Sequence, residues 1–185
     1  MGLQTNNERR TNKIFLHINR DGKIERRLAD GTVQAYDAVE GRLTAIYRIP
    51  RDFNGERRMY WGFDLEDGEE TYTLTLNENA SMLGSVARSL SFDIDSIDRV
   101  KFVPYKNGKF TNISVYNNGT RLNWRDIQLP APRDVVMSDG SVVKDYSERK
   151  LIYAQLLQVV QQELSKRKQL QKSGGVMQGD FPFQQ

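Results

Sequence analysis

The chain has 185 residues, among them 27 basic and 24 acidic residues, one histidine and no cysteine. Its length allows one domain with its own core and some extensions. The missing cysteines exclude disulfides, thiolate nucleophiles and cysteine-bound zinc, and the single His17 excludes a multi-histidine metal site. No apolar run approaches the roughly 18 residues that a membrane span needs, and the polar start has no signal-peptide stretch, so we expect a cytoplasmic protein without membrane contacts.

The first part of the chain has the alternation of β-structure. Residues 1–12 are polar and are expected to be disordered. Residues 13–28 form two extended runs around Asp21-Gly22, a dipeptide typical of hairpin turns. Dense strand signals follow, and we expect three consecutive strands, over 39–49, 57–65 and 71–76.

The pattern changes to helical spacing over 79–90, and two further strands are expected over 97–105 and 110–116. Five strands with a helix between the third and the fourth are typical of the five-stranded Greek-key OB barrel. We therefore predict a mainly β protein with an OB-fold domain over 13–128, the N-terminal hairpin included. A different small barrel with the same number of strands is the alternative.

The last third of the chain reads as a connector, a helix and a tail. The connector, 129–146, contains prolines and a second hairpin signal. A helix is expected over 147–171, with an apolar stripe that fits packing against the barrel; a contact between two copies of the chain is the alternative. The Gly-containing segment 172–185 lacks periodicity and is expected to be a flexible tail.

Single-stranded nucleic acid is bound by cations along its phosphates and by aromatic rings that stack on its bases. The period of two places Trp61 on the core side of its strand and Tyr60 on the outer side. Thr73 lies on the outer side of the next strand, and OB-folds bind oligonucleotides across these two strands, between two loops. The candidate DNA-binding residues occupy such outward positions and the loops: Arg48, Arg51, Phe53, Arg57, Arg58, Tyr60, Thr73, Lys101, Tyr105, Lys106, Lys109, Phe110 and Tyr116.

The C-terminal segment 179–183 reads Gly-Asp-Phe-Pro-Phe. It resembles the tip of bacterial and phage single-stranded DNA-binding proteins, which end in an acidic stretch and a short Pro-Phe motif. Together with the OB-like layout over 33–124, the resemblance implies non-specific binding of single-stranded DNA during replication, recombination or repair. It also implies a phage or mobile-element protein that works in the host cytoplasm.

In that family the tip recruits replication and recombination proteins. The resemblance implies that Phe183 is the anchoring ring, that Pro182 stiffens the approach, that Asp180 supplies the acid and that Phe181 adds a second contact. The chain departs from the family pattern in having one acid here and two glutamines after the last phenylalanine.

The sequence contains no nucleophile–base pairing and no Gly-rich phosphate loop. We therefore expect a protein that is not an enzyme and needs no cofactor. The remaining alternative is an OB-fold module that binds RNA or another protein, or that is purely structural, because such barrels serve all of these purposes.

Overall fold

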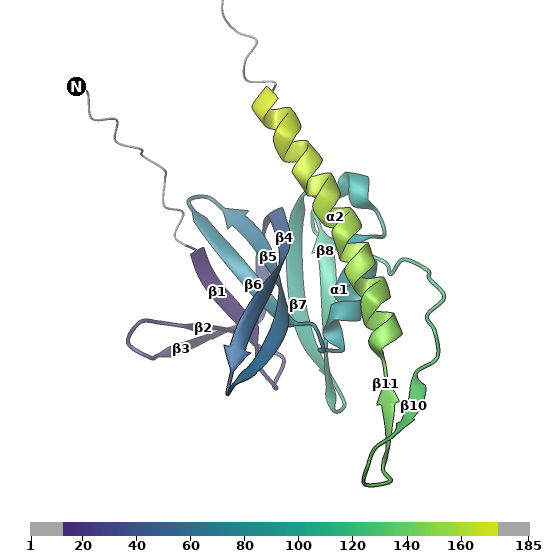
Figure 1. Ribbon diagram of the computed structural model, residues 1–185. Helices are drawn as coiled ribbons and strands as arrows, with labels where there is room; N and C mark the ends of the chain where they lie inside the picture. The colour runs from purple at the N-terminus through teal and green to yellow at the C-terminus, as the bar shows by residue number, and fades with distance from the viewer. Residues whose placement is uncertain (1–12, 174–185) are drawn as a thin grey trace, which may run out of the picture.

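A computed structural model describes residues 13–173, apart from the side chains of Phe53 and Lys172, and shows a mainly β protein with a long C-terminal helix (Figure 1). Its strands are β1 (Lys13–Ile18), β2 (Ile24–Arg27), β3 (Val33–Tyr36), β4 (Val39–Phe53), β5 (Glu56–Asp67), β6 (Glu70–Asn77), β7 (Arg99–Asn107), β8 (Phe110–Asn117), β9 (Thr120–Arg121), β10 (Arg133–Val136) and β11 (Val142–Asp145). The helices are α1 (Met82–Leu90), the 3-10 turn η1 (Ile94–Ser96) and α2 (Ser147–Ser173).

The five predicted strands are present as β4 to β8, and α1 lies between the third and the fourth of them. Their order in the sheet is β6-β5-β4-β7-β8, so the fourth strand returns to lie beside the first. Four strands with this order form a Greek key. The predicted helix at the C-terminus and the two predicted hairpins, β1–β2 and β10–β11, are also confirmed.

The main sheet has nine strands, which is more than the predicted five-stranded barrel. β1 pairs in parallel with the free edge of β6, β2 and β3 extend the sheet beyond β1, and β9 extends it at the other end. The reason is that an uncovered β6 edge would leave a row of backbone N–H and C=O groups unpaired.

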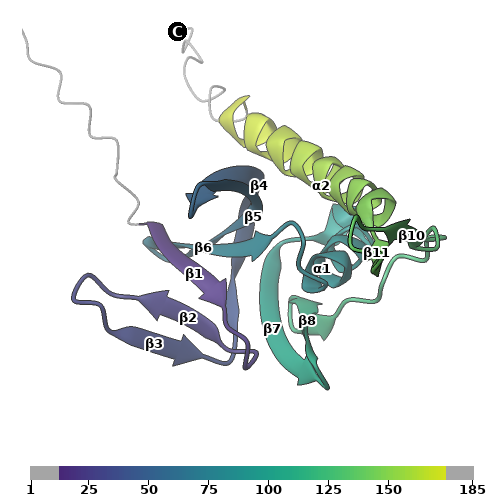
Figure 2. The ribbon, with the colours of Figure 1, turned by 60° about the horizontal axis from the view of Figure 1, so that its bottom comes forward.

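The sheet curls into a half-barrel (Figure 2). The turn between β1 and β2 comes so close to β7 that a Cβ at Gly22 would lie 3.4 Å from the backbone nitrogen of Lys106. Gly22 also has a φ of 74°, a conformation that favours glycine. The turn signal that predicts this hairpin therefore also allows its close approach to β7.

The strand β4 does not end at Pro50, as the sequence suggests, but continues to Phe53. β4 pairs with β7 only from Val39 to Arg42, so at Pro50 it has a partner on one side only, β5. An edge strand tolerates proline because no ladder hydrogen bond is required on its free side.

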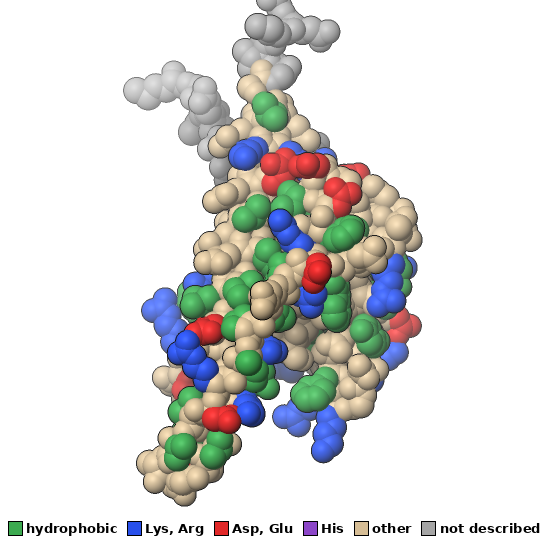
Figure 3. Space-filling view, turned by 90° about the vertical axis from the view of Figure 1, so that its right-hand side faces the viewer, with side chains coloured by type: hydrophobic (Ala, Val, Ile, Leu, Met, Phe, Trp, Pro, Cys, Tyr) green, Lys and Arg blue, Asp and Glu red, His purple; other side chains and the backbone are tan. Residues whose placement is uncertain are grey.

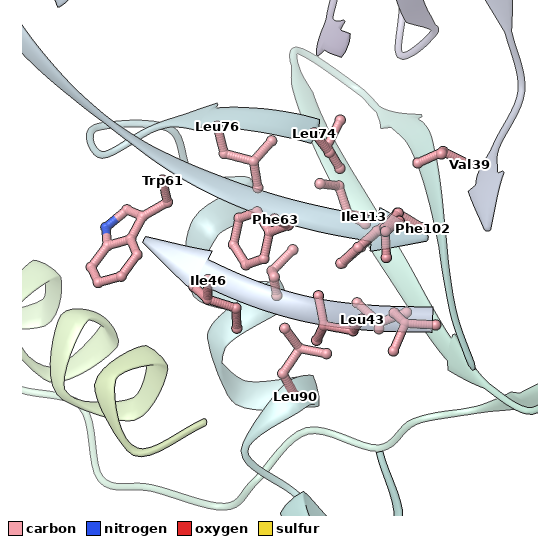
Figure 4. Packing of buried hydrophobic residues seen from close by; sticks show 14 of the residues in the cluster. Val39, Leu43, Ile46, Trp61, Phe63, Leu74, Leu76, Leu90, Phe102 and Ile113 are labelled. Carbon is pink, nitrogen blue, oxygen red and sulfur yellow. The ribbon is translucent and has the colours of Figure 1, made fainter. Parts of the chain in front are cut away.

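The inner side of the half-barrel holds the core, and Figure 4 shows side chains from several strands pointing into it. Phe63 and Phe102 meet edge to face, with their ring centroids 5.6 Å apart. Trp61 is only 1% exposed, which confirms its predicted inward orientation. Each such side chain contributes roughly 1.5–3 kcal/mol through burial.

The helix α2 packs against α1 and β4, and its residues Leu157, Val160 and Leu164 belong to the core. This confirms that the apolar stripe of the helix packs on the sheet domain. The crossing is close: a Cβ at Gly84 of α1 would lie 2.7 Å from the Tyr153 ring. Within residues 13–173, neither helix has an apolar stretch long enough to cross a membrane.

Candidate nucleic-acid interface

One group of the predicted residues lies on the outer side of β7 and β8. Strand alternation turns Val100, Phe102, Ile113 and Val115 inward, where they are buried. The residues between them form the outer side, which we call the β7–β8 face: Lys101, Val103, Tyr105, Phe110, Asn112, Ser114 and Tyr116.

The strand register places a tyrosine between two cations on this face. Tyr116 lies opposite Lys101 on β7 and opposite Arg121 on β9. Directly opposite residues in antiparallel strands point to the same side and lie about 5 Å apart at Cβ. The ring is thus flanked by positive charge on both sides.

The tip of the same hairpin is also basic and aromatic. Phe110 is 65% exposed at the start of β8, and Lys106 and Lys109 are exposed beside it. Outward positions of β7, β8 and β9 carry no carboxylate at all. The β7–β8 face can therefore attract phosphates and offer rings for stacking.

A second group lies on the outer side of β1, β4 and β5, and we call it the Arg51 cluster: Lys13, Phe15, Tyr47, Arg51 and Tyr60. The guanidinium of Arg51 lies 5.2 Å from the centre of the Tyr60 ring and 6.0 Å from that of Phe15. Lys13 Nζ lies 5.2 Å from the centre of the Tyr47 ring. These are cation–π distances, and they hold two cations over three rings.

The Arg51 cluster rests on a buried carboxylate. Asp64 is 5% exposed, and its Oδ1 accepts hydrogen bonds from Thr73 Oγ1 (2.6 Å) and Tyr47 Oη (2.9 Å). Its Oδ2 lies 2.7 Å from Lys13 Nζ. The hydrogen bond to Asp64 raises the pKa of Lys13 above its usual value, which outweighs partial desolvation. A buried carboxylate with three donors is well satisfied.

Thr73, which we expected on an open surface beside Tyr60, is fully buried. The prediction of an accessible Thr73 is wrong, because β1 pairs with the edge of β6 and places Phe15 beside Thr73, while Asp64 of β5 lies on its other side. The hydroxyl of Thr73 is taken by Asp64, and that of Thr75 by the backbone oxygen of Leu16. This side of β6 offers no room for a ligand.

The arginines of β4 and β5 have different environments. Arg48 makes two hydrogen bonds to Glu78, at 2.7 and 2.9 Å, and lies on the opposite side of the sheet, over Trp61. Arg58 forms an ion pair with Glu56, and both Arg57 and Arg58 are exposed. The side chain of Phe53 lies outside the described residues.

The predicted residues do not form one continuous surface. Between the Arg51 cluster and the β7–β8 face lie paired charges: Arg42 with Glu66 at 2.7 Å, and Arg99 with Glu40 at 2.9 Å and with Asp67 at 3.1 Å. These carboxylates repel phosphates, so the two surfaces are separate. The predicted tip residues, Asp180, Phe181, Pro182 and Phe183, lie outside the described part of the chain.

Sequence reasoning missed Phe15, Asp64 and Arg121. The alternation of Ile14 and Leu16 toward the core already turns Phe15 outward. The dipeptide Asn118-Gly119 is a hairpin signal that would have placed Arg121 beside β8. No local signal marks Asp64 as buried, because its partners come from three other strands.

Residues 13–173 contain no group of three or more histidine and carboxylate side chains placed to hold a metal ion. Comparisons with protein-family models, with curated proteins and with solved structures gave no match to this chain.

Proposed function

We propose that the protein binds single-stranded DNA without sequence preference, and without catalysing a reaction, through the β7–β8 face. The observation that carries this proposal is the row Lys101–Tyr116–Arg121, in which strand register fixes a ring between two cations. Glu40 of β4 lies opposite Lys101 and forms an ion pair with Arg99. Phe110 and its neighbouring lysines extend the same character to the tip of the hairpin.

The chemistry of this row favours single strands over duplex. Unpaired bases expose their ring faces, and each base that stacks on an aromatic side chain gains roughly 1–3 kcal/mol. The face is a sheet surface, whereas sequence reading in a duplex calls for an element that enters the major groove. Stacking on Tyr116 or Phe110 does not distinguish one base from another, which is why we propose non-specific binding.

The finer fold assignment, an OB-fold, is part of the same proposal. It is supported by the Greek-key order of β4 to β7 and by the position of α1 between β6 and β7. In such folds the loops between strands one and two and between strands four and five border the binding surface. Here these are the turns β4–β5 and β7–β8, which neighbour the Arg51 cluster and the β7–β8 face.

For the tail we propose the role that the resemblance implies: Phe183, with Pro182, Phe181 and Asp180, recruits replication or recombination proteins in the cytoplasm. Deletion of residues 174–185 should then leave DNA affinity unchanged or slightly raised, because Asp180 repels phosphates. Partner capture should be lost. Pull-downs with purified replication proteins, comparing the full chain with the deletion and with Phe183→Ala, test this role.

The DNA proposal is tested by fluorescence anisotropy with labelled oligo-dT and the variants Tyr116→Ala and Tyr36→Ala. Tyr36 is a matched control, because it is 42% exposed on β3, at the far edge of the sheet. We expect Tyr116→Ala to weaken binding about 5- to 150-fold, as the loss of one stacked base predicts. Equal affinities for both variants and the wild type would overturn the assignment of this face.

A further inference from the structure

Trp124 is an exposed tryptophan in a segment that has no regular secondary structure. It lies between β9 and β10, and 49% of it is accessible to solvent. The other tryptophan of the chain, Trp61, is almost fully buried. About half of Trp124 is thus open to contact with a ligand.

The segment that carries Trp124 is fastened to the last turn of α1. The backbone N–H of Arg125 donates to the carbonyl of Arg88 at 3.0 Å, and Arg88 Nε donates to the carbonyl of Arg125 at 3.1 Å. Arg125 Nη1 donates to the carbonyl of Ser91 at 3.2 Å. The Arg88 guanidinium lies 4.9 Å from the centre of the indole ring. The ring is therefore held in one orientation before any ligand arrives, which reduces the entropy lost on binding.

Trp124 lies past the β9 edge of the sheet, beside α1, which packs on the inner side of β8, so a single strand on the β7–β8 face would reach it by passing over this edge. Arg121 lies opposite Tyr116, and Trp124 follows three residues later, so its Cα lies within about 10 Å of that of Arg121. Arg88 and Arg125 add two cations beside the ring, and Asp126 is the one acid in this stretch of chain. Figure 3 shows the side of the molecule that carries α2 and the β10–β11 hairpin, where apolar side chains lie among lysines, arginines and carboxylates.

We propose that Trp124 is an additional base-stacking position, placed beyond the Tyr116 end of the β7–β8 face and occupied by the same single strand. The inference rests on the proposed DNA binding. It adds one stacking contact at the point where the bound DNA leaves the sheet. The occupant follows from charge complementarity: an indole beside Arg88 and Arg125, with Arg121 three residues before it, matches a base with its flanking phosphates.

The two tryptophans make a direct test possible. Oligo-dT of about 16 nucleotides, the upper end of the range for a single OB-fold, is titrated while anisotropy and intrinsic tryptophan fluorescence are recorded together. We expect emission to be quenched in parallel with binding. Trp124→Phe, which leaves only the buried Trp61, should lose the quenching and keep most of the affinity, because a phenyl ring still stacks.

Trp124→Ala should weaken binding about 5- to 150-fold. Because Trp124 is exposed, we expect Trp124→Ala to fold normally, and an unchanged midpoint of thermal unfolding checks this. If the wild type binds oligo-dT without quenching and Trp124→Ala retains its affinity, the inference is overturned and the proposed function stands. If the wild type binds no oligonucleotide at low salt, both are overturned.

Discussion

Asp64 offers a quantitative test of how the outer side of the sheet is held together. In Asp64→Ala the Thr73 hydroxyl, which is fully buried, loses its acceptor. Leaving such a donor unsatisfied costs about 1–3 kcal/mol. Tyr47 and Lys13 also lose a partner, but they are partly exposed and can turn to water, so each adds only about 0–1 kcal/mol.

The sum is a loss of about 1–5 kcal/mol in the free energy of unfolding. Asp64→Asn keeps an acceptor for Thr73 and Tyr47 and should lose only about 1 kcal/mol. Urea denaturation followed by circular dichroism measures both variants, provided that the m-value is unchanged.

A double-mutant cycle with Thr73→Val isolates the central contact. Thr73→Val removes the hydroxyl donor that Asp64→Ala would leave without an acceptor. The two losses in the free energy of unfolding should therefore be less than additive, by about 1 kcal/mol or more. Strictly additive losses, or equal losses for Asp64→Ala and Asp64→Asn, would refute the reasoning.

Phe110→Ala should change the free energy of unfolding by no more than about 0.5 kcal/mol, because the ring is 65% exposed, and should weaken oligo-dT binding about 5- to 150-fold in anisotropy titrations. Trp61→Ala, a core truncation, should cost about 3–5 kcal/mol in urea denaturation; an unchanged midpoint would contradict its burial. The raised pKa of Lys13 predicts stability that is complete below its ordinary pKa of 10.5 and lost as the pH rises through the higher folded value. Alkaline thermal melts of Lys13→Met should therefore show a shallower decline than those of the wild type, and parallel declines would exclude this contribution.

Local signals in the sequence predict the elements well. Alternating apolar residues predict β4 to β8, and apolar residues at helical spacing predict α1 and α2. The dipeptides Asp21-Gly22 and Asp139-Gly140 predict the two hairpins. Each of these signals lies within a short stretch of chain. Trp61 could be assigned to the core for the same reason, because the apolar residues Met59, Trp61, Phe63 and Leu65 occupy alternate positions in the sequence.

Contacts between distant strands could not be predicted in this way. The parallel pairing of β1 with β6 joins residues such as Phe15 and Thr73, which are far apart in sequence. No local sequence signal predicts that these residues pair. That pairing turns a polar threonine face into a buried one and brings Lys13 to Asp64. The ion pairs Arg42–Glu66 and Arg99–Glu40, which also join residues far apart in sequence, divide the predicted interface into two separate surfaces.

The central claim is that the β7–β8 face binds single strands through stacked rings and phosphate contacts. Its most direct test is an anisotropy titration of the full chain with oligo-dT, oligo-rU and duplex DNA at two salt concentrations. We predict tighter binding to oligo-dT than to duplex. We also predict a log–log salt slope of up to about −3 if Lys101 on this face and its neighbours Lys106, Lys109 and Arg121 neutralise four phosphates. Duplex binding as tight as that of oligo-dT, or no binding at low salt, would contradict the account, and a preference for oligo-rU would reassign the ligand to RNA.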